Sequence, residues 1–366
     1  MLKKILKNID YLIYILITII FCIGIIALYS ASQGAGGDVE KVYKQIAFFV
    51  AGFLISVVLI FVDYQIYKKL SIPIYLAMII MLVAVLFTNA TNGATSWFKI
   101  GPLSLQPAEF FKVAIMLTLA RVITNSKDNE KFNKIKNILF IIAVMFIPLL
   151  LIVKQPDYGT AIVILLIACS MLFVGEIKKR YIAIAAVLVI IGIPLMYNYV
   201  LPEHAKSRIN VYLNPELDAK GSGYNIIQSR LAVGSGMLTG MGVLNGNQTQ
   251  MGMLPMKMTD FIFSVISEEM GFIASASLVV LYVLLLYRIV RIAMLSKDEY
   301  GKLICIGTFT LILIHFTQNI GMCIGLLPIT GIPLPFISYG GSSMLTNFIA
   351  IGICESVHAR RKKHNY

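Results

Sequence analysis

The chain has 366 residues, of which 58% are hydrophobic and only 13% are charged, whereas a typical soluble domain has about 25% charged residues. This composition excludes an ordinary soluble domain and predicts an integral membrane protein. The net charge of +13 would suit a nucleic-acid-binding protein, but the basic residues lie in loops between apolar stretches, so we expect no nucleic-acid partner.

Ten apolar stretches are long enough to cross a bilayer, for which a helix needs roughly 20 residues. In chain order they are residues 11–28, 45–62, 72–87, 107–123, 138–153, 158–174, 182–200, 261–289, 303–327 and 338–357. We therefore predict an all-α membrane protein, with residues 1–366 forming a single polytopic domain of about ten transmembrane helices.

The basic residues predict the orientation, because cytoplasmic loops of membrane proteins carry an excess of Lys and Arg. Placing the N-terminus in the cytoplasm puts most of the Lys and Arg residues on the cytoplasmic side, and both termini are then cytoplasmic. Residues 201–259 become a large outer loop between the seventh and eighth spans. Loops of this length in compact proteins are usually functional or disordered, and the apolar pattern of residues 224–233 predicts a short helix at the membrane interface.

The outer loop ends at Asp260, where the eighth span begins. We predict Thr259 as the N-cap of this helix and Asp260 in its first turn. On helical spacing, one polar face would contain Asp260, Ser264, Ser267, Glu268, Gly271 and Ser275. Because polar groups at membrane depth normally face protein or a water-filled cavity, we expect this face to line a cavity.

Asp260 has two interpretations. It could be an ordinary helix-start acid, which the helix dipole favours, or a general base. A general base needs a pKa near the operating pH, and the dipole lowers the pKa of a carboxyl group. Glu268 should lie about 12 Å deeper along a straight helix, so burial would have to raise the pKa of Asp260.

Four other charged residues are candidates for substrate binding. Glu109 and Lys112 are spaced to form an ion pair, and a lysine within a span could instead hold an anionic group such as a phosphate. Asp157 is most simply a helix-start acid, with substrate contact as the alternative. Arg208, in the outer loop, could bind a diphosphate. The lone intramembrane histidine, His315, is expected to be a packed, hydrogen-bonded residue.

Residues 327–343 contain three prolines and three glycines within an apolar run. They predict a re-entrant or outer-rim element, because non-helical backbone at membrane depth must be buried in protein or line a cavity. The sequence has no nucleotide-binding motif, which excludes a soluble nucleotide as the energy source.

Seven motifs together resemble, in order, those of the SEDS family of shape, elongation, division and sporulation proteins. They are residues 106–112, 155–160, 213–215, 223–229, 259–263, 268–271 and 333–343. The resemblance spans nearly the whole chain, and residues 319–328 look more like the RodA branch than the FtsW branch, with a sporulation paralogue left open.

The resemblance implies a peptidoglycan glycosyltransferase that polymerises lipid II by inverting transfer at the outer face of the bacterial cytoplasmic membrane. Its substrates would be lipid II and a lipid-linked glycan strand, and its partner a class B penicillin-binding protein. Asp260 falls on the essential acid of the family, and Glu109 and Lys112 fall on its cavity pair. Gln228 and Ser338 lie in family motifs and are expected to bind substrate. The sequence predicts no certain cofactor; a divalent cation, Mg²⁺ or Mn²⁺, would suit the diphosphate leaving group.

Met256 and Met258 stand where the family usually has an acidic residue and a histidine, so activity could be reduced, redirected or supported by other residues. Two other functions fit the same sequence. A lipid II flippase needs access from both membrane faces, whereas the polar residues here gather at the outer side. A non-catalytic scaffold of the cell-wall machinery would not need Asp260.

Overall fold

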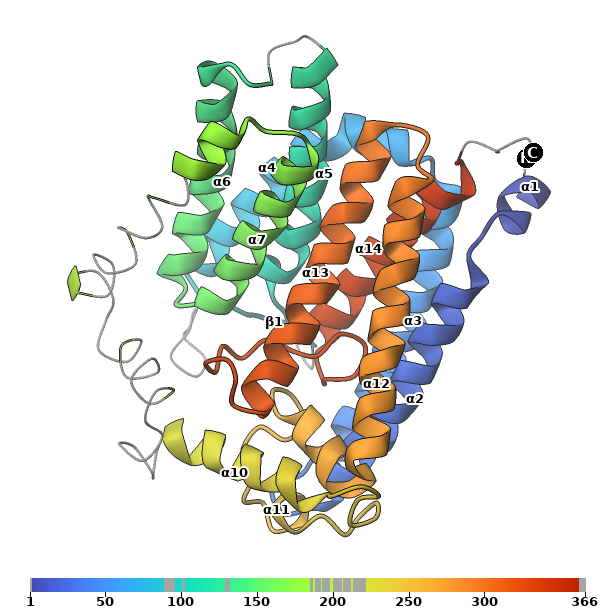
Figure 1. Ribbon diagram of the computed structural model, residues 1–366, viewed down its shortest axis with the longest axis vertical. Coiled ribbons are helices and arrows are strands. Elements are labelled where there is room, and N and C mark those ends of the chain that lie inside the picture. The colour runs from blue at the N-terminus through green and yellow to red at the C-terminus, as the bar shows by residue number, and fades with distance from the viewer. Residues whose placement is uncertain are drawn as a thin grey trace.

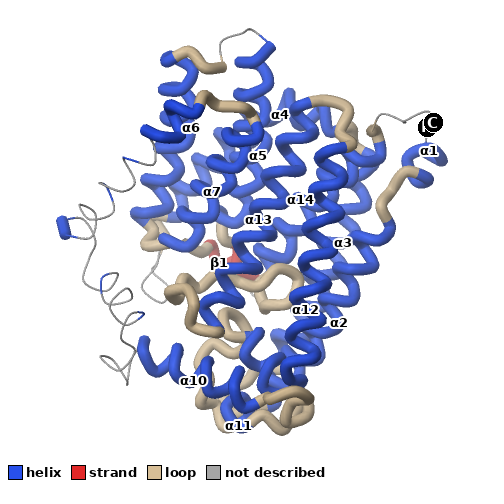
Figure 2. The backbone as a smooth tube through the Cα atoms, in the orientation of Figure 1, coloured by secondary structure: helices blue, strands red, loops and turns tan. Residues whose placement is uncertain are grey.

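The computed structural model describes residues 2–88, 96–100, 103–128, 132–184 and 222–361, with isolated positions between 187 and 212. Within these ranges the chain forms a bundle of long helices that run side by side (Figure 1). Strand is confined to one short hairpin in the described part of the chain (Figure 2). The predicted span at residues 182–200 falls mostly outside the described residues.

The bundle consists of long helices whose bounds mostly match the predicted spans. They are α2 (Tyr11–Gln33), α3 (Glu40–Phe61), α4 (Tyr64–Val85), α5 (Pro107–Asp128), α6 (Ile135–Lys154), α7 (Tyr158–Val174), α12 (Ile262–Met294), α13 (Glu299–Cys323) and α14 (Gly341–Ala359). A short helix, α1 (Leu2–Lys7), precedes them. The predicted helical, multi-span fold is thereby confirmed.

Six of these helices, α2, α3, α4, α6, α12 and α13, are long and apolar enough to cross a membrane by length and composition. Helix α7 is apolar but shorter. Helices α5 and α14 are more polar, and most of their residues are buried against other helices. Their polarity is compatible with a membrane location because protein, not lipid, surrounds them.

Helix α4 begins earlier than the predicted residue 72. The Asp63 carboxylate accepts a hydrogen bond from the backbone N–H of Gln65 and so caps the helix, which starts at Tyr64. Lys68 and Lys69 therefore belong to the first turns of α4, although their charge suggested a loop. An N-cap aspartate is a strong helix-start signal. The prediction used only the apolar residues, so it placed the start of this helix too late.

Helix α12 is not the continuous helix that we predicted. Gly271 has φ 74° and ψ −172° and breaks it into two helical segments, because no helix continues through a positive φ. At the break, the N–H groups of Phe272 and Ile273 donate to the carbonyl oxygens of Met237 and Leu238. The predicted common polar face therefore does not exist as a single surface.

The two ends of the described chain lie on the same face of the bundle (Figure 1), where Asn8 Nδ2 donates to the Ala359 carbonyl oxygen at 3.2 Å. The opposite face carries α10 (Ser222–Ser235) and α11 (Asn247–Gln250). Helix α10 lies across the ends of the bundle helices and confirms the short helix predicted at residues 224–233. Which membrane face each side occupies remains a prediction from the positions of the basic residues.

Residues 324–340 form the non-helical element that we expected between α13 and α14. Ile332, Leu334, Phe336 and Ile337 are buried, so the backbone polar groups here need partners. Side chains supply them: the carbonyl oxygens of Pro328, Ile332, Pro335 and Ser338 accept from Gln318, Asn319, Tyr282 and Gln45. The segment is thus a fixed wall within the bundle.

Candidate functional site

A cavity of about 390 Å³ lies where α5 begins, α6 ends and residues 324–340 cross the bundle. The hairpin of β1 (Phe98–Ile100) and β2 (Leu103–Leu105) leads into the start of α5 beside it. The charged or titratable residues that line it are Glu109, Lys112, Asp157, Asp260 and His315. Four segments far apart in the sequence therefore bring three acids, a lysine and a histidine to one cavity.

Lys112 is the most enclosed charge in the cavity, with 1% of its surface exposed. Its Nζ lies 2.6 Å from Glu109 Oε1 and 2.9 Å from His315 Nε2. His315 Nδ1 lies 3.2 Å from the Pro333 carbonyl oxygen. Because that oxygen can only accept, Nδ1 carries the proton and Nε2 accepts from the lysine. The three side chains form one chain of hydrogen bonds that fixes the lysine, and the ion pair predicted between Glu109 and Lys112 is present.

The two carboxylate oxygens of Glu109 differ in their hydrogen bonding. Its Oε1 accepts from Lys112, whereas its buried Oε2 has no hydrogen-bond partner among the described residues. A buried carboxylate oxygen without a partner is costly in free energy. The cavity therefore presents both an ammonium group and an open acceptor to whatever binds there.

Asp260 lies at the same cavity, half-buried, on the segment that precedes α12. Its backbone carbonyl accepts from Asn319 Nδ2 at 2.9 Å, and the same amide group donates to the Ile332 carbonyl oxygen at 2.8 Å. A Cβ built on Gly331 would lie 3.5 Å from Asp260 Oδ2, which places the carboxylate against the wall of residues 324–340. Asn319 thus fastens the Asp260 backbone to that wall.

The predicted start of α12 is wrong in one respect. The helix begins at Ile262 with Phe261 at the N-cap position, and the Thr259 hydroxyl donates to the Met256 carbonyl oxygen instead of capping the helix. Asp260 therefore precedes the helix and is not in its first turn.

Only Asp260 of the six residues predicted to share a face lines the cavity. Ser264 pairs with Ser229, and Ser267 pairs with Ser275. The Glu268 carboxylate accepts from the backbone N–H groups of Gln248 and Thr249 at the start of α11. Residues 229–249 account for this difference, because they pack on this part of α12 and hold Ser264 and Glu268 in a separate network.

Lys257 and Glu269 hold the segment between α11 and α12 against the end of α2. Glu269 Oε1 accepts from the hydroxyl of Ser30 at 2.6 Å, and Lys257 Nζ donates to the carbonyl oxygens of Ala35 and Thr249. Burial lowers the pKa of the Lys257 ammonium group, and the Glu269 carboxylate acts in the opposite direction. These two charges support the segment that leads to Asp260 and do not line the cavity.

Asp157 lines the cavity and also caps α7. Its Oδ1 accepts from the backbone N–H of Thr160 at 3.1 Å, and its Oδ2 accepts from Gln106 Nε2 at 2.8 Å. The helix-start interpretation is therefore correct, and a role in substrate contact stays a prediction. Through Gln106 the carboxylate also orients an amide group at the cavity.

Two of the three remaining predicted substrate-binding residues, Gln228 and Ser338, lie elsewhere. Arg208 falls outside the described residues. Ser338 is buried, its hydroxyl donating to the Thr259 carbonyl oxygen at 2.6 Å and accepting from the backbone N–H of Leu334. Gln228 lies on α10, and neither Gln228 nor Ser338 lines the cavity. Through its hydrogen bond to Thr259, Ser338 stabilises the segment that contains Asp260 without lining the cavity.

The two departures from the family pattern have different surroundings. Met256 lines the cavity with 60% of its surface exposed, whereas Met258 is 5% exposed and packs in the core. Of the two methionines, only Met256 therefore faces the cavity.

A preformed metal site is absent from the described residues, since no group of three His, Cys, Asp or Glu side chains is placed to hold an ion. A Mg²⁺ ion is commonly held by one or two carboxylates together with substrate phosphates. The open Oε2 of Glu109 fits that arrangement, whereas the residues present do not form a site complete without substrate.

Comparison with known proteins agrees with this architecture. A family model for FtsW, RodA and SpoVE, described as cell cycle proteins, matches residues 10–363. The chain belongs to this family. The peptidoglycan glycosyltransferase MrdB of Escherichia coli strain K12 is 36% identical over 338 residues, covering 92% of this chain and 90% of MrdB. The resemblance to the SEDS family and to its RodA branch is thus confirmed.

Two solved structures share the fold of this SEDS protein. One is a chain in a peptidoglycan synthase complex that coordinates polymerisation and crosslinking, with a TM-score of 0.82, 26% identity and coverage of 96% of this chain and 97% of that chain. The other is RodA of Thermus thermophilus, with a TM-score of 0.72, 25% identity and coverage of 97% and 98%.

His315 and Asn319 are the residues at the site that sequence reasoning underestimated. His315 was expected to be a packed, hydrogen-bonded residue, and it is one, but its partner is Lys112, 203 positions away in the sequence. Asn319 carried no expectation of its own, although it lies in a stretch that matched the family. Both are on one face of α13, and their spacing of four residues was the only available signal.

Proposed function

We propose that this chain polymerises lipid II, with Asp260 as the general base that activates the acceptor sugar. The chain is a peptidoglycan glycosyltransferase of the SEDS family and a multi-pass membrane protein. The observation that carries the proposal is that Asp260 and the Glu109–Lys112–His315 chain line one cavity. Polymerisation needs both a base for the acceptor and a cation for the leaving group, and the cavity provides both types of group.

The proposed reaction joins two lipid-linked sugars. The acceptor hydroxyl loses its proton to the Asp260 carboxylate while its oxygen forms a bond to the anomeric carbon of the donor. The bond from that carbon to the diphosphate breaks, and the diphosphate takes the electron pair. Attack from the face opposite to the leaving group inverts the configuration at the anomeric carbon, as we expect for this family.

Lys112 is suited to stabilise the leaving diphosphate. An ammonium group has three N–H donors, and Glu109 and His315 account for two of them. The third remains for a phosphate oxygen. A fixed, buried cation stabilises developing negative charge more effectively than a mobile one, because it does not reorganise during the reaction. Arg208 stays a second candidate for this role.

The proposed partner is a class B penicillin-binding protein, the type of crosslinking enzyme that the family resemblance implies. The similarity to a chain of a peptidoglycan synthase complex supports it, since that assembly couples polymerisation to crosslinking. The proposed membrane is the bacterial cytoplasmic membrane, with the cavity facing outward and both termini cytoplasmic.

The test is polymerisation of fluorescent lipid II by the purified protein, with and without partner and Mg²⁺. Asp260→Asn keeps the size of the side chain and removes the base, and general-base catalysis contributes roughly 10²–10⁴-fold, so polymer formation should fall by at least about 100-fold. Asp38→Asn is the matched control because Asp38 is exposed on the same face and outside the cavity; it should retain activity. Polymerisation by Asp260→Asn at the unmodified rate would refute the base role, and translocation of label without polymer would indicate a flippase.

A further inference from the structure

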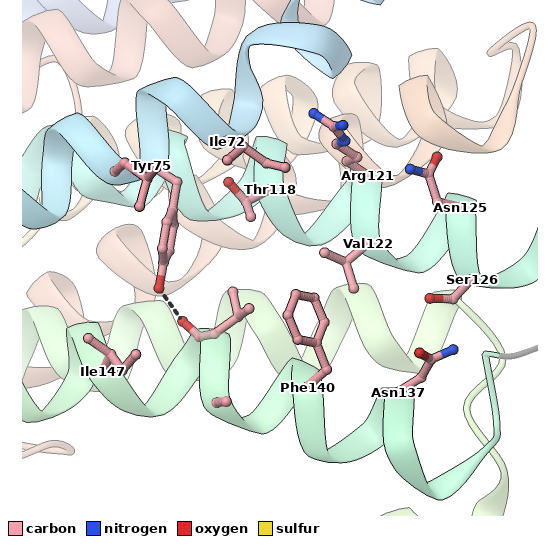
Figure 3. A pocket seen from close by; sticks show the side chains of 13 residues that line it. Ile72, Tyr75, Thr118, Arg121, Val122, Asn125, Ser126, Asn137, Phe140 and Ile147 are labelled. Atoms are coloured by element: carbon pink, nitrogen blue, oxygen red, sulfur yellow. Dashed lines mark hydrogen bonds between the residues drawn. The ribbon is translucent and has the colours of Figure 1, made fainter.

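An apolar groove of about 480 Å³ lies between α4, α5 and α6, near the start of α4 and the end of α5 (Figure 3). It is therefore at the end of α5 opposite to Glu109 and Lys112. Ile72, Val122, Phe140 and Ile147 provide apolar walls, and Asn125, Ser126 and Asn137 gather at one end (Figure 3).

Two prolines help to build this groove. Pro73 in α4 and Pro148 in α6 lack a backbone N–H, so the carbonyl oxygens of Lys69 and Val144, four residues earlier, lose their helical partners. Groove residues replace those partners. Arg121 Nη1 donates to the Lys69 carbonyl oxygen at 3.3 Å, and the Tyr75 hydroxyl donates to that of Val144 at 2.8 Å (Figure 3). The groove is thus a satisfied structural feature and not a packing defect.

The groove is open to the surroundings of the bundle. Ile72, Leu76, Phe140 and Ile147 line it and are each 46–55% exposed. In a protein that spans a membrane, such side chains face lipid tails, which are as apolar as the side chains themselves. An acyl chain is the occupant that this surface fits.

The polar end of the groove adjoins a basic pocket. The pocket shares Asn137 with the groove and is lined by Lys134, Lys136, Lys178 and Arg180, with no acidic residue among its described lining. Helix α6 also begins here without a side-chain cap, and the N-terminus of a helix favours an anion.

Within the described part of the chain, no acidic side chain is paired with a cation of this basic pocket. Asp128 is exposed at the end of α5, and Glu176 is paired with Lys127. Neither lines the groove or the pocket. Among the described residues the four cationic side chains therefore have no carboxylate partner, which leaves them open to an external anion.

We propose that the groove and the basic pocket together bind one anionic phospholipid. An acyl chain would occupy the groove, and the phosphate headgroup would lie among Lys134, Lys136, Lys178 and Arg180. Basic pockets between transmembrane helices are suited to anionic headgroups. The site faces the side that we expect to be cytoplasmic, away from the Asp260 cavity, and the proposal does not depend on the polymerase assignment.

Headgroup selectivity can be measured by native mass spectrometry of the full chain titrated with dioleoyl phosphatidylglycerol or dioleoyl phosphatidylcholine. The unmodified protein should bind phosphatidylglycerol about tenfold more tightly. The double variant Lys134→Gln/Lys136→Gln should lose this preference. The control Lys297→Gln/Lys302→Gln removes two exposed lysines beside the α12–α13 connection, and should keep it. The proposal would be overturned if the unmodified protein bound the two lipids equally tightly. It would also be overturned if both double variants lost the preference for phosphatidylglycerol to the same extent.

Occupation of the groove has its own test. Ala143 lines the groove, whereas the adjacent exposed Ile142 does not. Ala143→Phe should fill the groove and weaken phosphatidylglycerol binding by about tenfold, while Ile142→Phe should leave it unchanged. Unaltered binding in a folded Ala143→Phe protein, verified by its thermal unfolding, would show that the lipid is held only as part of the ordinary lipid shell, which contradicts the proposal.

Discussion

At the scale of single residues, the site depends on a buried charge held by two neighbours. Lys112 is within hydrogen-bonding distance of both Glu109 and His315 and has almost no exposed surface. A buried charge without its counterion is strongly destabilising, whereas removing both charges together is often nearly neutral. Lys112 should therefore affect two measurable properties: the stability of the fold, through its ion pair with Glu109, and polymerisation, through its proposed contact with the diphosphate.

Double-mutant analysis can separate the effect on stability from the effect on polymerisation. Lys112→Met should lower the free energy of unfolding by about 3 kcal/mol, because Glu109 is left buried and unpaired. Adding Glu109→Gln should restore much of that loss. Neither protein should polymerise lipid II, because each lacks the cation. Thermal unfolding in detergent measures the first effect, and losses that simply add in the double variant would contradict a coupled pair.

The two methionines before Asp260 should respond differently to substitution. Met256→Glu should change the free energy of unfolding by less than about 0.5 kcal/mol, because the side chain is largely exposed. Met258→His should cost about 1–3 kcal/mol, since it buries a polar ring in an apolar site. Thermal unfolding of the two variants compares them directly, and equal losses would show that Met256 is not free at the cavity.

The sequence was sufficient to nominate most of the charged residues at the cavity but not their partners. Asp260, Glu109, Lys112 and Asp157 stand out because acids and lysines beside apolar spans are rare. The link from Lys112 to His315 crosses 203 positions of sequence, and it depends on how α5 packs against α13. No local pattern encodes that contact.

At the scale of elements, hydropathy located the membrane spans well but did not show where a helix is broken. Helix α7 has the predicted bounds, and α12 begins one residue after its predicted start but ends five residues later than predicted. The break at Gly271 was missed because the apolar pattern runs through it without a proline. A single glycine does not distinguish a tolerated helix position from a positive φ.

Gly271 offers a direct test of the break in α12. Its φ and ψ belong to a region open essentially to glycine alone, and an added Cβ would lie 2.3 Å from the Gly240 backbone nitrogen. Gly271→Ala should therefore cost about 3 kcal/mol of unfolding free energy.

Gly234 is the matched control for this substitution. It lies in α10, and an added Cβ would meet no atom within 4 Å, so Gly234→Ala should be neutral or stabilising by up to about 1 kcal/mol. Thermal unfolding compares the two variants. If Gly271→Ala unfolds at the same temperature as Gly234→Ala, α12 does not have the described break.

At the scale of the whole molecule, the fold separates two functional faces. The Asp260 cavity, α10 and α11 lie towards one face, and both ends of the described chain lie at the other. Composition and span count predicted this multi-span arrangement, because an apolar chain has few alternatives in a membrane. The short β-hairpin and the path of residues 324–340 were beyond prediction, because each depends on partners from distant segments.

The orientation gives a prediction for labelling in intact cells. With the exposed Cys22 and Cys169 replaced by serine, Met251→Cys should react with a membrane-impermeant maleimide from outside the cell. Lys297→Cys should react only after the membrane is permeabilised, since basic loops stay in the cytoplasm. The opposite pattern would reverse the assignment of the two faces.

The most direct test of the central claim separates binding from chemistry at Asp260. Binding of a fluorescent lipid II and its polymerisation should be measured on the same preparation of Asp260→Asn in nanodiscs. We predict that the variant binds lipid II with about the affinity of the unmodified protein and forms polymer at least about 100-fold more slowly, because only proton removal from the acceptor is lost. Polymer formation at the unmodified rate would contradict the account.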